Sequence, residues 1–261
     1  MNCKCSKAGG PQLMDSPRVA RPTNRTLKTV ESKPMIGETP SPALDSWLTP
    51  NSLFYIRNHF DSPSVSDSPD SGWIVSIKGS VRNPGTFNFS DLSKFPKRTL
   101  VVTMECAGNN RVDLTPKVPG NQFESGAVST AVWAGISLSQ ALESFGIDPK
   151  AMELLFEGAD SGEPEPGVNT QHFQRSLPME VAMHPDTLLA FEMNGEPISV
   201  EHGGPVRLVV PGWYGMASVK WVHEITALTK PHEGYFQTYK YMFRSNENDE
   251  RPVSVMQVKS L

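Results

Sequence analysis

Short apolar runs separated by turn residues dominate this chain of 261 residues. The runs that are rich in β-branched and apolar residues span residues 73–79, 100–105, 152–158, 188–193 and 206–210. Their length and composition are typical of β-strands. Asn194-Gly195 directly follows one of these runs and predicts a tight hairpin turn. We expect the consecutive apolar residues 100–102 to form a buried strand.

Helical signals are few, and each is short. One helix is predicted to begin at Ser90, where a serine can cap the first turn. Ser137 and Gln140 have the spacing of a capping box for a helix over residues 138–145. A third helix is predicted to begin at Ser176. Because hairpins and short helices are mixed along the chain, the sequence favours an α+β fold.

The N-terminal segment differs in composition from the rest of the chain. Residues 1–45 are rich in Pro, Ser, Thr, Lys and Arg and have no apolar periodicity, which predicts a disordered tail. Cys3 and Cys5 lie in this segment. A Cys-x-Cys pair without a second pair is a weak metal-binding signal, so we expect them to belong to the tail.

Charge and hydropathy exclude several classes of partner. The chain has 24 Lys and Arg against 28 Asp and Glu, a net charge of -4, which predicts no nucleic-acid partner and no polybasic membrane contact. No apolar run approaches the roughly 20 residues that a transmembrane helix needs. The N-terminus lacks the apolar stretch of a secretory signal, so the sequence predicts a cytoplasmic location.

The stretch around Cys106 has the strongest chemical signal. The apolar run at 100–105 leads directly into Cys106-Ala-Gly-Asn-Asn-Arg111. Small residues permit a tight turn and the close approach of another molecule. Arg111 favours the thiolate, which is the form of cysteine that binds metals or attacks substrates. The pattern alone leaves a second interpretation open, in which Cys106 is a small buried hydrophobe.

Cys106-Ala-Gly-Asn-Asn-Arg111 resembles the Cys-Ala-Gly-Asn-x-Arg signature of the sulfite oxidase family of molybdenum enzymes. Further matching blocks extend the resemblance over roughly residues 52–261. The resemblance implies the mixed-sheet, α+β molybdopterin-binding fold of that family, here in residues 46–250. It also implies that Cys106 binds molybdenum directly, while a pyranopterin dithiolene, molybdopterin, supplies two further sulfur ligands.

Other blocks imply a cofactor pocket. By resemblance, Arg57, Asn58 and His59 line this pocket, and Asp160 holds the pterin ring. An arginine suits a phosphate or an oxyanion because its planar fork donates two parallel hydrogen bonds. The sequence around Asp160 leaves a second interpretation open, in which this residue only forms an Asx turn in a loop.

The C-terminal half of the chain contributes the remaining cofactor residues. The resemblance places His202 and Arg207, in His-Gly-Gly-Pro-Val-Arg, on the molybdopterin phosphate. The resemblance also assigns Lys220 to the cofactor. The alternation of Lys220 with its neighbours fits an exposed strand position equally well. The other residues that the resemblance assigns to the cofactor are Ser176, Gly215 and Ser218.

The resemblance also implies a substrate site. Arg57 and Arg111 would hold a small oxyanion such as sulfite, and Tyr241 would donate a hydrogen bond to it, with a shift of one residue left open. Two departures from the family lie near this site. Phe123 stands where the animal and plant enzymes have Trp, and Asn110 stands where sulfite oxidases usually have a second Arg.

The implied activity is oxidation of sulfite to sulfate by oxo transfer at a Cys-ligated molybdopterin centre. Because the chain has no haem-binding Cys-x-x-Cys-His and no flavin or nucleotide motif, we expect an external electron acceptor, either a cytochrome or oxygen. Residues 251–261 resemble the first strand of the immunoglobulin-like dimerisation domain of the family. The remainder of that domain is missing from the sequence, which leaves a homodimer open.

Three alternatives remain at this stage. The same scaffold supports reduction of nitrate or of a sulfoxide, and the loss of the second Arg at Asn110 weakens the argument for sulfite specifically. A non-catalytic, cofactor-binding relic is a second alternative. A zinc or redox-thiol protein is a third, although no partner ligand lies near Cys106 in the sequence.

Overall fold

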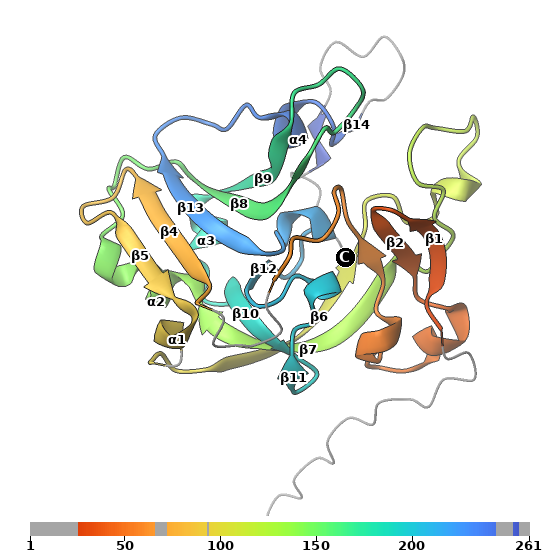
Figure 1. The fold of residues 1–261 in the computed structure, drawn as a ribbon, viewed down its shortest axis with the longest axis horizontal. Coiled ribbons are helices and arrows are strands. Elements are labelled where there is room, and N and C mark those ends of the chain that lie inside the picture. The colour runs from red at the N-terminus through yellow and green to blue at the C-terminus, as the bar shows by residue number, and fades with distance from the viewer. Residues whose placement is uncertain (1–25, 66–71, 93, 244–252, 256–261) are drawn as a thin grey trace, which may run out of the picture.

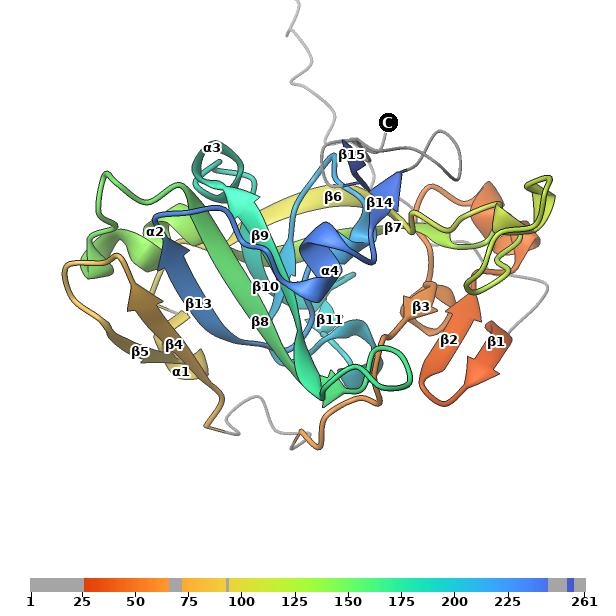
Figure 2. The same cartoon turned by 90° about the horizontal axis from the view of Figure 1, so that it is seen from above.

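The computed structural model describes residues 26–65, 72–92, 94–243 and 253–255. Most of the predicted tail and of the segment 251–261 therefore lies outside the described residues. Two five-stranded sheets form facing layers, with a three-stranded sheet at one side (Figures 1 and 2). This arrangement confirms the α+β fold with mixed sheets.

The first of the two large sheets carries the Cys106 segment at the end of a strand. It runs in the order β11-β10-β7-β6, β12 also pairs with β10, and all its pairs are antiparallel. Asn194 and Gly195, with φ of 52° and 84°, form the predicted hairpin turn between β10 and β11. The strands are β6 (Arg98–Glu105), β7 (Val128–Ser137), β10 (Leu188–Met193), β11 (Glu196–Pro197) and β12 (Arg207–Val209).

The second large sheet runs in the order β5-β4-β13-β8-β9. β13 is parallel to β4, whereas every other pair is antiparallel. Apolar residues of this sheet pack against those of the first sheet and form the main core, for example Phe156 against the layer that contains Leu189. The strands are β4 (Ile74–Gly79), β5 (Gly85–Asn88), β8 (Glu153–Gly162), β9 (Gln171–Pro178) and β13 (Val222–Leu228).

The prediction of a disordered tail is wrong for its last part. β1 (Lys28–Ser32) and β2 (Met35–Glu38) pair with each other, β2 also pairs with β3 (Ile56–Arg57), and a 3-10 helix, η1, spans Ser41–Asp45. The hydroxyl of Thr39 lies 2.6 Å from that of Ser129 in β7. This segment is held by pairing with distant strands, so its own composition does not reveal it.

Two helix predictions also need correction. The helix expected over residues 138–145 is α2 (Leu138–Leu142) followed by a 3-10 turn, η4 (Glu143–Phe145). Its capping box is not formed, because the Ser137 hydroxyl bonds to that of Ser139 instead. Ser176 begins no helix and lies inside β9.

The remaining α-helices of the described residues are α1 (Phe89–Leu92), α3 (Met179–Ala182) and α4 (Tyr235–Thr238). A small two-stranded sheet pairs β14 (Met242–Phe243) with β15 (Val253–Ser254).

β6 is only half-buried, contrary to the expectation of a buried strand. Val102 and Met104 are buried, whereas Val101 is 48% exposed. β6 ends the strand order of its sheet, so one face packs on the core and the other reaches the surface. The strand is nevertheless fixed along its whole length by β7, and it ends immediately before Cys106.

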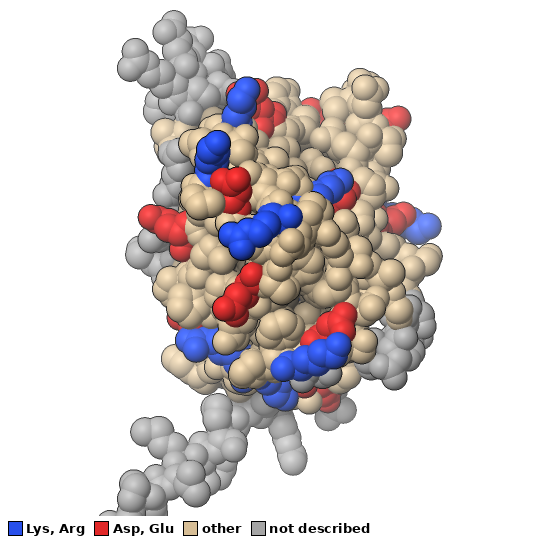
Figure 3. All heavy atoms as spheres, turned by 90° about the vertical axis from the view of Figure 1, so that its left-hand side faces the viewer, with Lys and Arg blue, Asp and Glu red and all other residues tan. Residues whose placement is uncertain are grey.

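On the face drawn in Figure 3, Lys and Arg are interspersed with Asp and Glu and form no single basic patch. Among the residues that the structure describes, no helix is long and apolar enough to cross a membrane.

Gly135 is required where β7 meets β10. A Cβ atom at this position would lie 2.1 Å from the Leu189 carbonyl oxygen and 2.6 Å from the Ala190 Cα. We therefore expect Gly135→Ala to lower the free energy of unfolding by about 1–3 kcal/mol, as overpacking typically does. Urea denaturation measures this change. Gly85→Ala is the control, since its Cβ would meet only ordinary contacts at 3.4 Å, and equal loss in both variants would contradict the argument.

Candidate active site

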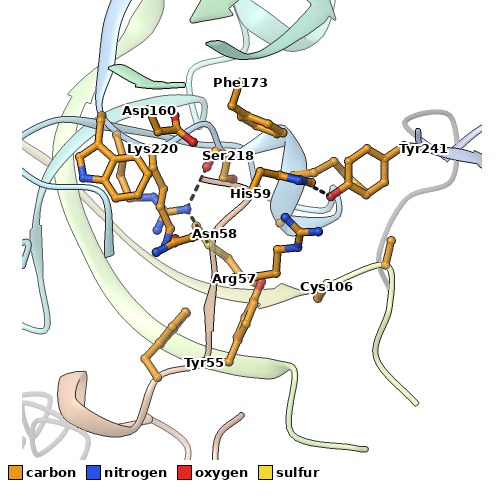
Figure 4. A pocket seen from close by; sticks show the side chains of 17 residues that line it. Tyr55, Arg57, Asn58, His59, Cys106, Asp160, Phe173, Ser218, Lys220 and Tyr241 are labelled. Carbon is orange, nitrogen blue, oxygen red and sulfur yellow. Dashed lines mark hydrogen bonds between the residues drawn. The ribbon is translucent and has the colours of Figure 1, made fainter. Parts of the chain in front are cut away.

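Two connected cavities meet at Arg57, Cys106 and Tyr241. The inner cavity, of about 60 Å³, is drawn in Figure 4. The outer cleft, of about 650 Å³, shares these three lining residues with it. The predicted site residues that line the inner cavity are Arg57, Asn58, His59, Cys106, Asp160, Arg207, Gly215, Ser218, Lys220 and Tyr241. Segments that are distant in the sequence thus converge on one site.

Cys106 is held rigidly at the junction of the two cavities. Its backbone N–H donates to the Ala127 carbonyl at 2.9 Å, and the Gly108 N–H donates to its Sγ at 3.4 Å. Desolvation raises the pKa of the Cys106 thiol and outweighs the opposing effect of Arg57. Arg111 favours the thiolate, as expected, but its effect on the pKa is smaller than that of desolvation. Ionisation of the Cys106 thiol requires a stronger positive charge, such as that of a metal ion bound to the sulfur.

Arg57 and Arg111 bring two cations to the outer cleft beside Cys106. Nη1 of Arg57 is buried and has no hydrogen-bond partner among the described residues. Arg111 donates from its Nη1 to the Pro119 carbonyl at 3.2 Å. Gly120 packs so closely on this guanidinium that a Cβ would lie within 1.9 Å of Nη1. The unused donor of Arg57 is suited to an anion that enters through the cleft.

His59 positions Tyr241 at the same junction. The His59 Nε2 and the Tyr241 hydroxyl lie 2.6 Å apart, and the imidazole stacks on Phe173 with ring centroids 4.7 Å apart (Figure 4). Desolvation lowers the pKa of His59 and raises the pKa of Tyr241, so both groups are neutral near pH 7. The structure thus places Tyr241 at the junction of the cavities without a shift of one residue, and His59 lines the inner cavity beside it.

Lys220 and Asp160 form a polar wall of the inner cavity. The Lys220 ammonium donates to Asn58 Oδ1 at 2.6 Å and to the Glu201 carbonyl at 2.5 Å. Desolvation, with Arg207 nearby, lowers the pKa of Lys220. Desolvation also raises the pKa of Asp160 to about 6, although Lys220 opposes it. Both residues line the cavity, so the alternatives of an exposed strand lysine and an Asx turn do not apply.

Arg207 is a buried cation that is bonded to neutral groups. Its Nη1 donates to the His202 carbonyl at 2.7 Å and its Nη2 donates to the Ser218 carbonyl at 2.9 Å. The guanidinium lies over the Trp133 ring at 4.9 Å, and desolvation lowers its pKa to about 10. Because a buried charge is costly without a counter-charge, this arginine fits an anionic ligand group such as a phosphate.

Two predicted cofactor residues do not line either cavity. The His202 ring is buried against Phe54, with its Nε2 2.8 Å from the Asn51 carbonyl oxygen. Desolvation lowers the pKa of His202 to about 3, so the ring is neutral, and its backbone carbonyl positions Arg207. Ser176 lies in the interior of β9, where its hydroxyl is buried away from the cavities.

The sequence interpretation missed Arg175 in β9. This residue is fully buried, and none of its three guanidinium nitrogens has a hydrogen-bond partner among the described residues. It lies 5.4 Å from the centre of the Tyr241 ring, and desolvation lowers its pKa to about 10. A signal was present, because Arg175 occupies an inward position between Phe173 and Leu177 on an alternating strand. Arg175 does not itself line either cavity. The residues of the inner cavity that were missed are Phe54, Tyr55, Met104, Ala107, Phe173, Met216 and Trp221.

Comparison with known families agrees with this geometry. The sequence model of one protein family, the oxidoreductase molybdopterin binding domain, matches residues 59–236. The chain belongs to this family. Curated relatives include a sulfite oxidase from Arabidopsis thaliana, 34% identical over 241 residues, which cover 87% of this chain and 60% of that protein. They also include an NADH nitrate reductase from Cichorium intybus, 37% identical over 198 residues, which cover 73% of this chain and 21% of that protein.

A solved structure supports the fold directly. The sulfane dehydrogenase SoxCD from Paracoccus pantotrophus superposes with a TM-score of 0.75 and 30% identity, covering 94% of this chain and 62% of that chain. The resemblance to the sulfite oxidase family is therefore confirmed for the catalytic domain. The chain spans 60% or less of the length of the two curated relatives.

The family implies a molybdenum–molybdopterin cofactor, and the residues present fit such a group. Arg207 is a buried cation for the phosphate, Lys220 and Asp160 offer a donor and an acceptor to the pterin ring, and Cys106 offers a soft sulfur ligand to the metal. The chain is thus a molybdopterin oxidoreductase domain.

Proposed function

We propose that this protein oxidises sulfite to sulfate and passes the electrons to an external acceptor. The observation that carries this proposal is that Arg57, Arg111 and Tyr241 line the same outer cleft as Cys106. The two arginines supply positively charged hydrogen-bond donors, and Tyr241 supplies a neutral one. A small oxyanion that is bound there would lie beside the sulfur that holds the metal.

Each residue has a separate task in this reaction. When bound, the molybdenum–molybdopterin group supplies oxygen-atom transfer and two-electron redox chemistry. Arg57 donates from its unused Nη1 to the substrate anion, and Arg111 adds a second positive charge from the cleft wall. Tyr241, held by His59, directs its hydroxyl to the same place. Phe123 is buried in the cleft wall and helps to exclude water from it.

Reduction of nitrate is the second candidate, because nitrate reductases are among the relatives. Two arginines beside Cys106 favour sulfite, which carries up to two negative charges, over nitrate, which carries one. The two functions are separated by measuring sulfite-dependent reduction of ferricyanide and dye-dependent consumption of nitrate on the same purified holoenzyme. We expect turnover with sulfite. Turnover with nitrate alone would overturn the proposal.

Arg111→Gln tests the anion site. Removing one charged hydrogen-bond donor of this kind costs about 1.5–3 kcal/mol, so the KM for sulfite is expected to rise about 10- to 150-fold. The value of kcat should change less, because Arg57 and Tyr241 remain. Steady-state kinetics measure both. Arg98→Gln is the control, since Arg98 pairs with Asp186 on the surface, and an unchanged KM in Arg111→Gln would place Arg111 outside the substrate site.

A further inference from the structure

Three side chains form a separate cluster on the second large sheet. Glu157 lies in β8, His172 in β9 and His223 in β13, three strands that are adjacent in the sheet (Figure 1). One potential ligand atom from each residue lies within 4.8 Å of the other two. All three side chains are half-buried, so the cluster is open to solvent on one side.

Strand irregularities bring these side chains to one face. The pairing of β13 with β8 shifts between Val222 and Glu224, which makes His223 the extra residue of a bulge. Strict alternation would point His223 inward, because Ile225 is buried, but the bulge turns it outward beside Glu157. The pairing of β8 with β9 is also irregular, between Glu157 and Ser161, next to His172. Such bulges re-aim side chains and are common next to functional sites.

The hydrogen bonds leave ligand atoms free to face a common point. Nδ1 of His172 lies 3.0 Å from the Gly158 carbonyl oxygen, and this bond fixes the tautomer that leaves the Nε2 lone pair free. The Gln174 amide donates to Oε2 of Glu157, and Oε1 faces His223. Nε2 of His223 lies 3.1 Å from this Oε1. Bonds from ligand residues to a backbone carbonyl and to an amide are the usual support of a metal site.

We propose that Glu157, His172 and His223 bind a divalent transition-metal ion, with Zn²⁺ as the expected occupant. Two histidines and one carboxylate are a donor set that Zn²⁺ uses with a water as fourth ligand, which fits the open side of the cluster. Imidazole ligands disfavour Mg²⁺ and Ca²⁺, which take oxygen ligands. The site is distinct from the molybdopterin cavity and does not depend on the proposed sulfite activity.

The ion would join three strands next to the cofactor wall. Asp160 is three residues beyond Glu157 on β8 and lines the inner cavity, and the Gly158 peptide between them accepts the bond from His172. A bound ion would therefore hold the irregular part of β8 that carries Asp160. Since a ligand that binds only the folded state stabilises it, Zn²⁺ at about 100 times its Kd is expected to raise Tm by about 5 °C.

The test uses the full chain, without an affinity tag, purified from a host that makes molybdopterin. Cys3 and Cys5 are replaced by Ser in all samples so that their thiols do not bind the probe. After removal of metals with a chelator that leaves molybdenum in place, Zn²⁺ binding is measured by calorimetry, and the zinc environment is measured by X-ray absorption. We expect one Zn²⁺ per chain, with nitrogen and oxygen ligands at about 2.0 Å and no sulfur at about 2.3 Å. Mg²⁺ should not compete.

Variants identify the ligands. His223→Gln and Glu157→Gln are each expected to weaken Zn²⁺ binding at least tenfold and to abolish the Tm shift, whereas the control His184→Gln, at an exposed histidine outside the cluster, retains both. Circular dichroism confirms that each variant is folded. The proposal is overturned if the folded protein retains no Zn²⁺, if sulfur appears among the ligands, or if binding survives in His223→Gln. Equal loss in His184→Gln would show adventitious surface binding only.

Discussion

Cys106→Ser is expected to lower kcat by at least about a thousandfold, while the protein keeps most of its molybdopterin. A serine oxygen is a hard ligand and cannot replace the soft thiolate that tunes the metal. The pterin is retained because Arg207, Lys220 and Asp160 lie on the inner cavity and are unchanged. Steady-state turnover with sulfite and fluorescence of the released, oxidised pterin measure the two effects separately.

The matched control is Cys3→Ser, which removes a thiol from the N-terminal segment and is expected to leave kcat unchanged. Retention of full activity in Cys106→Ser would show that this sulfur does not bind the metal. Loss of both activity and pterin would instead show that the thiol is needed to assemble the site.

Arg207→Ala is expected to reduce the pterin content of the purified protein at least about tenfold, since a charged hydrogen bond to phosphate is worth about 1.5–3 kcal/mol. The guanidinium is a buried cation on the inner cavity, and its partners in the structure are the carbonyls of His202 and Ser218. The same change leaves those carbonyls unpaired, so the variant should also be less stable. Pterin fluorescence per mole of folded protein measures the result.

Arg207→Lys separates these two effects, because it keeps the positive charge and loses the planar fork. We expect an intermediate pterin content and a smaller loss of stability than in Arg207→Ala. Wild-type pterin content in a folded Arg207→Ala variant would place the phosphate elsewhere in the cavity.

Several residues that the motifs assigned to one site lie together in the structure. Arg57, Cys106, Arg207 and Lys220 were all assigned from short matching blocks, and the structure brings all four to the inner cavity. Such blocks are informative because the cofactor requires particular chemistry at particular chain positions. Ser176 was also assigned to the cofactor by resemblance, but its side chain lines neither cavity.

Long-range packing explains what the sequence could not predict. β1 is mostly polar and β2 has only four residues, and they form because they pair with each other and with β3, which the local pattern does not encode. Val101 is exposed because β6 ends its strand order, a property of topology and not of the apolar run itself. The pKa of Cys106 likewise depends on desolvation by distant segments, which outweighs the neighbouring arginines.

Molybdenum and pterin content, measured on the same sample of wild-type protein from a host that makes molybdopterin, tests the central claim most directly. Elemental analysis gives the metal, and fluorescence after oxidation gives the pterin. The site described above predicts near-equal amounts of molybdenum, pterin and protein. Well-folded protein that contains neither would contradict the assignment of the inner cavity as the molybdopterin site.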